Sequence, residues 1–496
     1  MKERILTLTV KLAALAFVLL LAQGCPWVDP EEREEQRKIA EDPDYEAKTF
    51  LRSQYMDIFY YWREEVMARN ATLKPYDYPI EDFFDKMLYS GDHWSWMCDK
   101  ETYISDETGV IQGTWGVSLG QATEYYHDYN IRVRYIYPGS PFAQYGVTRG
   151  AVMTKIAGKN IEDDAEGFTK EKLTIFNENY NKSPQSFTFR LVDGREVSFT
   201  ASMASSLSTH PGLITRIIQP SDYPGLTEPV GYFLYMGFKA NFLDDINQAM
   251  TEFHDAGLHS VIVDLRYNGG GDSRASQLLV DYLAPLSAVG KPYVIRKHNS
   301  YLASLNAAYS DAENTATVAG NKNSLSLDKL YFIVGAGSAS ASEMVINGLK
   351  PYYGEKQQMV GDTTYGKPNG MYVLMYPGMK ADYDAYNNGD FSSLQWVFLP
   401  ICFFNENSEG EKIPEQGFAP SPQAYRPDDL YHDFGVEESS IAACLEHIAK
   451  GAYPSGIPGS PKRTSLTKSA GKGQCRIPME EDRPEYGSYR VQRPIQ

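Results

Sequence analysis

The segment that decides the fold is Tyr331-Phe-Ile-Val-Gly-Ala-Gly-Ser-Ala-Ser-Ala-Ser-Glu343. Its apolar start predicts a buried strand, its small residues predict a tight turn, and a helix is predicted from Glu343 to Leu349. The turn brings Ser338, Ser340 and Ser342 close to the helix N-terminus. Unpaired backbone N–H groups and the helix dipole stabilise negative charge there, so a serine alkoxide or an oxyanion would be favoured.

The same residues also allow a purely structural interpretation. Ser340-Ala-Ser-Glu343 fits a capping box, in which serine and glutamate satisfy each other's exposed amides. Because such caps are common, this segment considered alone favours a cap over a catalytic serine. Two other segments reverse that preference.

The first of these is Val261-Ile-Val-Asp-Leu-Arg-Tyr-Asn-Gly-Gly-Gly271, which is followed by helical spacing from Ser273 to Leu283. Apolar residues around one aspartate predict a central strand, and three glycines allow a sharp turn. A glycine amide in such a turn can donate to a developing oxyanion, a contact that lowers barriers by about 3–4 kcal/mol. The alternative is an ordinary strand-to-helix turn. A dinucleotide or phosphate loop is not predicted, because neither G-x-G-x-x-G nor G-x-x-x-x-G-K-[ST] is present.

The second is Met359-Val-Gly-Asp-Thr-Thr-Tyr-Gly-Lys367, a short strand that leads to a lysine. Most lysines are solvated surface charges. A lysine acts as a base only when it is neutral, and burial favours the neutral amine. A serine–lysine pair is a known arrangement for acyl transfer.

Together these segments resemble the C-terminal processing (tail-specific) serine peptidases. The resemblance implies that Ser340 is the nucleophile, that Lys367 is the general base, and that the amides of Gly270 and Ala341 hold the oxyanion. It also implies hydrolysis through an acyl-enzyme, with no metal and no organic cofactor. The motifs that carry the resemblance follow the family's order: Gly231-Tyr-Phe-Leu-Tyr-Met-Gly-Phe238, Asp264-Leu-Arg-Tyr-Asn-Gly-Gly-Gly271, Ser338-Ala-Ser-Ala-Ser-Glu-Met344 and Gly361-Asp-Thr-Thr-Tyr-Gly-Lys367.

Two features depart from the family's pattern. Lys367 follows Ser340 by 27 residues, about two more than is common in the family, and the surplus is predicted in the turn at 352–358. Family members often carry a glutamine four residues after the lysine, where this chain has Met371, which cannot hydrogen-bond as an amide does. Asn369 is an alternative amide that the sequence alone does not select. These departures keep open a second interpretation, a catalytically degenerate peptide-binding lipoprotein of the same fold.

Other chemistry is poorly supported by the sequence. Gly116-Val-Ser-Leu-Gly120 matches the nucleophile-elbow pattern of esterases, but residues 121–130 lack the helical periodicity that should follow it, so Ser118 is not predicted to be catalytic. The eight histidines are scattered without an H-E-x-x-H motif or nearby paired cysteines, so no metal site is predicted. A net charge of −17 and the lack of a basic cluster argue against nucleic-acid binding.

The N-terminal segment predicts the localisation of the protein. Basic residues precede a short apolar run that ends in Leu21-Ala-Gln-Gly-Cys25, which resembles a bacterial lipobox. The resemblance implies removal of the signal peptide 1–24 and lipidation of Cys25, so lipid chains would hold the protein to a membrane of the bacterial cell envelope. Acidic residues 25–47 are predicted to form a flexible tether, and the membrane face is left open.

Changes in periodicity predict the remaining domains. Helical spacing over 48–101 predicts an N-terminal helical module, and alternation over 102–204 predicts a β-rich domain. The latter resembles a PDZ domain, in which Trp115, Gly116, Val117 and Ser118 would form the loop that binds a peptide C-terminus. The alternative is a β-rich spacer. Residues 205–452 alternate strands with helices, which predicts an α/β catalytic domain, and the family resemblance implies a crotonase-like α/β spiral. Residues 453–496 are predicted to be a polar tail.

Overall fold

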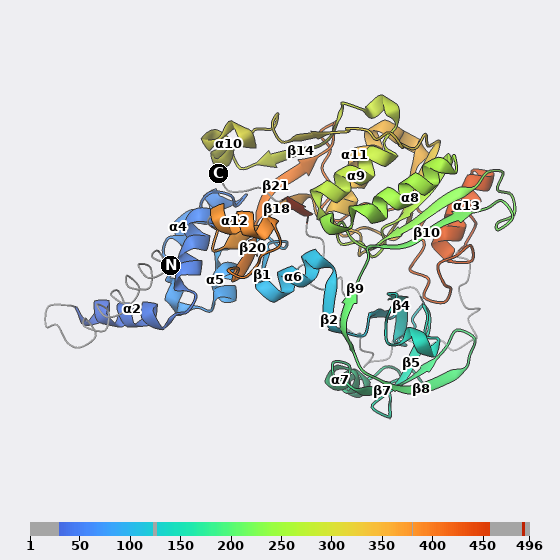
Figure 1. The fold of residues 1–496 in the computed structure, drawn as a ribbon, viewed down its shortest axis with the longest axis horizontal. Helices are drawn as coiled ribbons and strands as arrows, with labels where there is room; N and C mark the ends of the chain where they lie inside the picture. The colour runs from blue at the N-terminus through green and yellow to red at the C-terminus, as the bar shows by residue number, and fades with distance from the viewer. Residues whose placement is uncertain (1–28, 123–125, 379, 457–488, 492–496) are drawn as a thin grey trace. The chain divides into compact units, whose positions relative to one another are not determined.

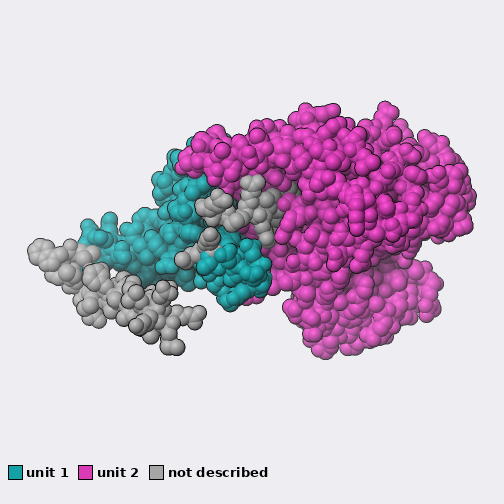
Figure 2. Space-filling model, turned by 45° about the horizontal axis from the view of Figure 1, so that its top comes forward, with its two compact units in different colours: residues 1–99, 374–400, 494–496 teal, residues 100–373, 401–493 magenta. Residues whose placement is uncertain are grey.

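The computed structural model describes residues 29–122, 126–378, 380–456 and 489–491, in two compact units (Figures 1 and 2). The first unit comprises the described residues up to Asp99 together with 374–400, and the second comprises 100–373 and the described residues from 401 to 493. The predicted signal peptide and Cys25 lie outside the described residues. Across the described part of the chain, no helix is long and apolar enough to cross a membrane.

The first unit packs helices around a small antiparallel sheet in the order β1-β20-β19. Tyr55 and Phe59 are buried, and a π-helical turn at Leu51–Met56 interrupts the helical spacing that was predicted from residue 48 onward. Residues 374–400, which were predicted to belong to the 205–452 domain, are part of this unit, because β20 pairs with β1 and β19 pairs with β20. The elements are α2 (Pro30–Glu41), α3 (Tyr45–Phe50), α4 (Arg63–Asn70), α5 (Ile80–Met87), β1 (Trp96–Asp99), β19 (Leu374–Tyr376), α12 (Lys380–Asn387) and β20 (Trp396–Leu399).

Helix α2 corrects the prediction of a flexible tether over 25–47. Asp29 caps the helix by accepting a hydrogen bond from the Glu31 N–H at 2.9 Å. Arg37 forms ion pairs with Glu34 and Glu41, at the spacings that place side chains side by side on a helix. The charge pattern that suggested a solvated spacer therefore also satisfies the requirements of an exposed helix.

The main sheet of the second unit has the order β10-β11-β12-β16-β17. Its strands run parallel except for the antiparallel edge strand β10. The strand predicted around Asp264 is β12, and its central place in the sheet confirms that prediction. The strands are β10 (Gly212–Ile218), β11 (Val230–Tyr235), β12 (Ser260–Asp264), β16 (Lys329–Val334) and β17 (Gln357–Gly361).

Helices cover both faces of this sheet (Figure 1). On one face α8 (Leu243–Asp255), α9 (Ser273–Leu283) and α11 (Ala341–Tyr353) pack side by side. On the other face α13 (Ser439–Lys450) contributes Ile441 and Leu445 to a core that includes Ile262 and Ile333. Because both faces are buried, the strands are almost continuously apolar, as the sequence indicated.

A second sheet of this unit has the order β13-β22-β18-β21-β14-β15. Its strand β18 begins two residues after Lys367, and its strand β13 begins at Gly271, the third of the three glycines. The short strand β22 pairs with β13 on one side and β18 on the other. The strands are β13 (Gly271–Asp272), β14 (Pro292–His298), β15 (Thr315–Thr317), β18 (Asn369–Tyr372), β21 (Ile401–Glu406) and β22 (Tyr489–Val491).

Residues 110–208 form a β-rich region around their own apolar core. Its sheet has the order β3-β4-β5-β7-β8, with β6 paired to β5, and Phe142, Phe187 and Phe189 lie at its centre. A short 3₁₀ turn, Ala143–Tyr145, lies between β4 and β5. The elements are β2 (Val110–Thr114), β3 (Val117–Gly120), β4 (Arg132–Ile136), β5 (Val152–Ile156), β6 (Lys159–Asn160), α7 (Lys170–Asn179), β7 (Gln185–Arg190), β8 (Glu196–Ala201) and β9 (Ala204–Ser208), and β2 pairs with β9.

A buried ionic network holds the chain where β12 ends. The Arg266 guanidinium pairs with Asp264 at 2.8 Å and with Glu438 at 2.6 Å, and both carboxylates are fully buried. Asp428 receives hydrogen bonds from Arg149 at 2.7 Å and from the Tyr267 hydroxyl at 2.6 Å. The network therefore connects the β-rich region to the segment that leads into the glycine turn (residues 269–271).

Removing the central cation should destabilise the second unit. We expect Arg266→Ala to lower the free energy of unfolding by about 3–5 kcal/mol, because two buried carboxylates lose their counter-charge. Urea unfolding followed by circular dichroism measures the change. Arg195→Ala is the control, since the Arg195–Asp193 pair is largely exposed. Equal, small effects of both variants would contradict a role for the network in stability.

Candidate active site

Ser340 occupies the turn between β16 and α11 and is the N-cap residue of that helix. Its backbone has φ = 55°, a left-handed conformation that is strained for a residue with a side chain. The residue is fully buried, and its hydroxyl forms no hydrogen bond with any described residue. A strained turn that presents an unengaged hydroxyl at a helix N-terminus suits a nucleophile.

The neighbouring serines have structural roles instead. The Ser338 hydroxyl donates to the Leu265 carbonyl at 2.8 Å, and the Ser342 hydroxyl donates to the Asn268 carbonyl at 2.8 Å. The Ala339 N–H also donates to the Asn268 carbonyl, at 3.1 Å. These bonds tie the serine turn to the segment after β12, and they leave Ser340 as the serine of this turn with a hydroxyl available for chemistry.

The glycine turn lies directly against Ser340. A Cβ atom added to Gly270 would come within 2.9 Å of the Ser340 Cβ and 3.1 Å of the Ala341 nitrogen. The Gly270 N–H, which was expected to be available to an oxyanion, donates to Asn268 Oδ1 at 2.9 Å in this structure. An asparagine that accepts from the amide two residues ahead forms a common local turn, and this bond accounts for the difference. Ala341 is the first residue of α11, where an N–H has no partner within the helix.

Glu343 connects the serine turn (residues 335–340) to the lysine loop (residues 362–368) through one buried carboxylate. Its Oε2 accepts hydrogen bonds from the Ser340 N–H at 3.0 Å and from the Lys367 N–H at 2.8 Å. Its Oε1 accepts from the Thr364 hydroxyl at 2.5 Å and from the Gly366 N–H at 2.7 Å. Residues that are 27 positions apart in the chain are thereby held at a single oxygen atom.

Lys367 lies in the loop between β17 and β18 and is only 1 % exposed. The loop is fixed from two sides: the Tyr365 N–H donates to the Ser338 carbonyl at 2.9 Å, and the Thr364 N–H donates to the Phe418 carbonyl at 3.0 Å. The lysine side chain is therefore enclosed within the protein and does not extend into solvent, as a base of this kind requires.

Sequence reasoning missed two residues of this site. Glu343 was considered only as a capping partner of Ser340, and the structure adds its bonds to the lysine loop. Asn268 was not singled out, although both its carbonyl and its side chain bind the two turns. The signal for Asn268 was its position immediately before three glycines, where asparagine often forms a side-chain turn.

The predicted peptide-binding loop lies in the β-rich region, at the start of β3. Trp115 is buried, and its indole N–H donates to the Tyr180 carbonyl at 2.7 Å, just beyond the end of α7. The Gly116 N–H is engaged with Thr114 Oγ1 at 3.0 Å. Val117 and Ser118 belong to β3, which pairs with β4 on one side only within the described sheet. Ser118 is buried in this strand and is not at a strand-to-helix turn, unlike the serine of an esterase elbow.

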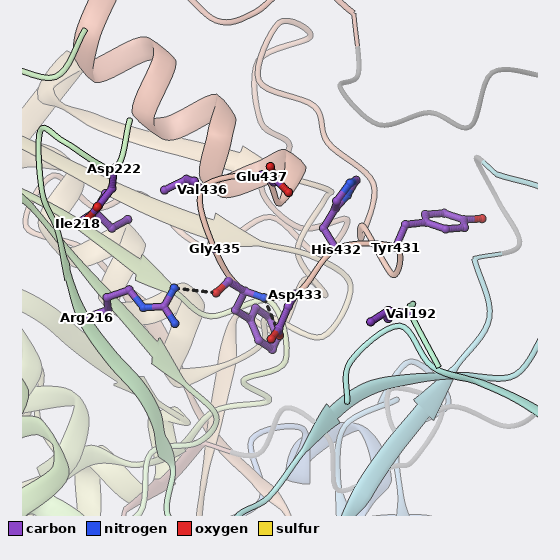
Figure 3. Close-up of a pocket in the computed structure, with 11 residues that line it drawn as sticks. Val192, Arg216, Ile218, Asp222, Tyr431, His432, Asp433, Gly435, Val436 and Glu437 are labelled. Atoms are coloured by element: carbon purple, nitrogen blue, oxygen red, sulfur yellow. Dashed lines mark hydrogen bonds between the residues drawn. The ribbon is translucent and has the colours of Figure 1, made fainter. Parts of the chain in front are cut away.

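A separate cavity of about 580 Å³ lies between β10, the β7–β8 turn and the segment before α13 (Figure 3). Arg216 donates a hydrogen bond to the Phe434 carbonyl at 3.0 Å across it. Its lining carries the acidic residues Asp222, Asp433 and Glu437, and it contains none of the predicted site residues. Among the described residues, no group of three or more histidine, cysteine, aspartate or glutamate side chains could hold a metal ion.

Comparison with known families identifies the central domain. The profile of Peptidase family S41 matches residues 229–381, a range that includes β11, β12, the serine turn and the lysine loop. The chain therefore contains an S41 peptidase domain, of the family to which the C-terminal processing peptidases belong. No curated protein matches the chain.

Solved structures share the fold at low sequence identity. A protein described as an S41 protease from Bacteroides fragilis NCTC 9343 is 21 % identical, with a TM-score of 0.57 over 80 % of this chain and 96 % of that one. The photosystem II D1 C-terminal processing protease is 16 % identical, with a TM-score of 0.44 over 84 % of this chain and 98 % of that one. The first likeness supports a mixed α/β S41 peptidase fold, and the second is too distant to support more.

The buried carboxylate should give the protein a measurable pH dependence. Burial raises the pKa of Glu343 above its ordinary value of 4.5, although the four hydrogen bonds that it accepts oppose the shift. The folded state therefore holds this proton more tightly than the unfolded state, and the contribution of Glu343 to stability falls as the pH rises from about 4.5 through the folded pKa.

Glu343→Gln isolates this effect, because glutamine does not titrate. We expect the unfolding free energy of wild type to fall relative to that of Glu343→Gln as the pH rises through that range. Urea unfolding of both proteins at a series of pH values measures the difference. A difference that moves in favour of wild type with rising pH would show that the folded pKa is lowered instead.

Proposed function

We propose that the protein is a serine endopeptidase that cleaves protein or peptide substrates near their C-termini, with Ser340 as nucleophile and Lys367 as general base. One observation carries this proposal. A single oxygen of Glu343 holds the main chains of Ser340 and Lys367 together inside the protein, while the Ser340 hydroxyl has no partner among the described residues.

The reaction follows from this arrangement. Ser340 Oγ attacks the scissile carbonyl while the neutral Lys367 amine takes the hydroxyl proton. The negative charge develops on the carbonyl oxygen at the N-terminus of α11, where the Ala341 N–H and the helix dipole stabilise it. Lys367 then gives its proton to the leaving amine, and water hydrolyses the acyl-enzyme. In this scheme Gly270 contributes a second amide only if its bond to Asn268 is exchanged for one to the substrate.

Two features support a peptide as the substrate. The pairing of β22 with both β13 and β18 indicates that an extended backbone fits between the glycine turn and the strand after Lys367. The open edge of β3, beside Trp115 and its partner Tyr180, offers a second place for an extended peptide. We assign residues 102–204 to a PDZ-like domain that binds the substrate's free C-terminus with the Trp115–Ser118 loop.

The remaining assignments complete the proposal. The S41 domain takes the crotonase-like form of the α/β spiral, and the helices of the first unit form an accessory module. The lipobox Leu21–Cys25 supports a lipoprotein that is anchored in the bacterial cell envelope through Cys25 after removal of residues 1–24. Its partners are then envelope proteins or peptides with free C-termini.

A serine-reactive fluorophosphonate tests the assignment of the nucleophile. We expect wild type to be labelled and Ser340→Ala to remain unlabelled, because the reagent bonds to the activated hydroxyl. Lys367→Ala should lower the labelling rate by at least about 100-fold, the usual contribution of a general base. In-gel fluorescence and intact-mass spectrometry measure the labelling.

Other outcomes identify the rival functions. If no variant is labelled although all of them are folded, the result favours the non-catalytic binder. Two features make this binder the specific alternative: the Gly270 N–H is already bonded to Asn268, and Met371 stands where family members often carry glutamine. Labelling that is lost in Ser118→Ala but kept in Ser340→Ala identifies an esterase that uses Ser118, and would overturn the proposal.

Peptide binding tests the second part of the proposal. We expect Ser340→Ala to bind a fluorescent peptide with a free C-terminus at least about tenfold more tightly than the same peptide with an amidated C-terminus, since amidation removes the charged carboxylate that backbone amides capture. Fluorescence anisotropy measures both affinities. Equal affinities would contradict recognition of the C-terminus.

A further inference from the structure

The strand β22, near the end of the chain, fills the gap between β13 and β18. It runs parallel to both neighbours, with Tyr489 opposite Gly271 of β13 and Arg490 opposite Met371 of β18. The sheet order β13-β22-β18 shows that these two neighbours meet through β22 in the described structure. We refer to β13 and β18 as the two walls of this gap.

The gap borders the proposed catalytic residues. The first wall begins at Gly271, directly after Gly270, and a Cβ atom added to Gly270 would lie 2.9 Å from the Ser340 Cβ. The second wall begins two residues after Lys367. An extended peptide that reaches Ser340 between these walls can bond to the main chains of both, as peptides do when they add a strand to a sheet. β22 therefore holds the position that such a peptide needs.

The first wall is held in place by contacts other than those with β22. The Asp272 N–H donates to the Phe238 carbonyl at 2.7 Å, and the Phe238 N–H donates to the Gly270 carbonyl at 2.8 Å. A Cβ atom added to Gly271 would lie 2.1 Å from the Phe238 oxygen, so the two segments are in close contact. The Gly270 N–H is bonded to Asn268 as well. Loss of β22 would leave these bonds intact.

The second wall is held from its other side. β18 pairs with β21, with Asn369 opposite Phe404 and Gly370 opposite Phe403, and β21 pairs in turn with β14. β22 is only three residues long, so its place in the sheet depends on few main-chain bonds. A short strand between two separately held segments can leave without unfolding either of them.

We propose that β22 is a built-in competitor of the substrate. In the resting protein Tyr489–Val491 occupies the gap, and a peptide substrate binds there only in exchange for this segment. The ligand that the gap recognises is an extended peptide main chain, because the walls offer it the N–H and C=O groups of strand backbones. This inference deepens the proposed function and rests on it.

The test measures how tightly the gap binds a peptide from outside. The probe is a fluorescent peptide with the sequence of residues 486–494, amidated so that it offers no carboxylate to the Trp115–Ser118 loop. The parent chain is full-length Ser340→Ala, which cannot cleave the probe. In this chain Arg490→Pro removes a main-chain N–H from β22 and weakens its pairing. Because a segment of the same chain competes at an effective concentration of about the millimolar order, we expect Arg490→Pro to raise the affinity at least about tenfold. Fluorescence anisotropy measures the affinity.

Three controls show that the main chain of β22 is the competitor. Arg490→Ala keeps the main-chain N–H, so it should bind the probe as weakly as the parent chain. A chain that ends at Ser488 lacks β22 and should bind the probe at least as tightly as the Arg490→Pro chain. Its melting temperature should equal that of the parent chain, because both walls keep their other bonds. A probe that is N-methylated at the residue corresponding to Arg490 should bind weakly to every chain.

Several outcomes would overturn the inference. One is equal probe affinity in the parent chain, Arg490→Pro and the truncated chain. Another is an increase in affinity as large in Arg490→Ala as in Arg490→Pro, because the strand would then not be held by its main chain. Unfolding of the truncated chain, detected by circular dichroism, would show that β22 is a structural strand and would also contradict exchange.

Kinetics with Ser340 intact separate this inference from the proposed function. A competitor affects KM alone, so Arg490→Pro should lower the KM of a peptide substrate and change kcat by less than about twofold. A change in kcat with KM unaltered would contradict competition. If wild type is not labelled by the fluorophosphonate, the proposed function fails. The probe affinities in Ser340→Ala still decide whether β22 occupies a peptide site.

Discussion

The Glu343 carboxylate is the interaction on which this site depends. Its two oxygens accept four hydrogen bonds from the serine turn and the lysine loop, and the residue is fully buried. Each segment alone is an irregular turn of small residues with little intrinsic preference for one conformation. The carboxylate fixes both at once, and so it sets the relation between a strained serine and a buried lysine.

Other contacts within the second unit hold the serine turn and the glycine turn in place beside Glu343. β12 and β16 lie side by side in the sheet, so the glycine turn and the serine turn leave it at the same edge. Asn268 then binds the serine turn through its carbonyl and the glycine turn through its side chain. The Arg266 network holds the chain between β12 and Asn268, and Arg149 connects that network to the β-rich region. Ser340, the proposed nucleophile, is thus positioned by a rigid scaffold, which is what efficient acyl transfer requires.

Much of this fold could be predicted from residue patterns. The apolar run before Asp264 predicted the central strand, and the small residues after Val334 predicted the turn that carries Ser340, because burial and turn chemistry leave a local signature. The second role of Glu343 could not be predicted, since it depends on contacts between distant segments. The bond from the Gly270 N–H to Asn268 is local, and its signal, an asparagine immediately before three glycines, was overlooked. The helix at Pro30–Glu41 was missed because exposed helices and solvated spacers have similar compositions, and the pairing of residues 374–400 with the first unit leaves no local signal.

The most direct measurement is a crystal structure of the protein after reaction with a peptidyl phosphonate. The account predicts phosphorus bonded to Ser340 Oγ, a phosphonyl oxygen within hydrogen-bonding distance of the Ala341 nitrogen, and Lys367 Nζ within reach of the serine oxygen, with the Glu343 bonds to both main chains intact. An adduct on another residue, or one on Ser340 with the lysine amine turned away into solvent, would contradict it.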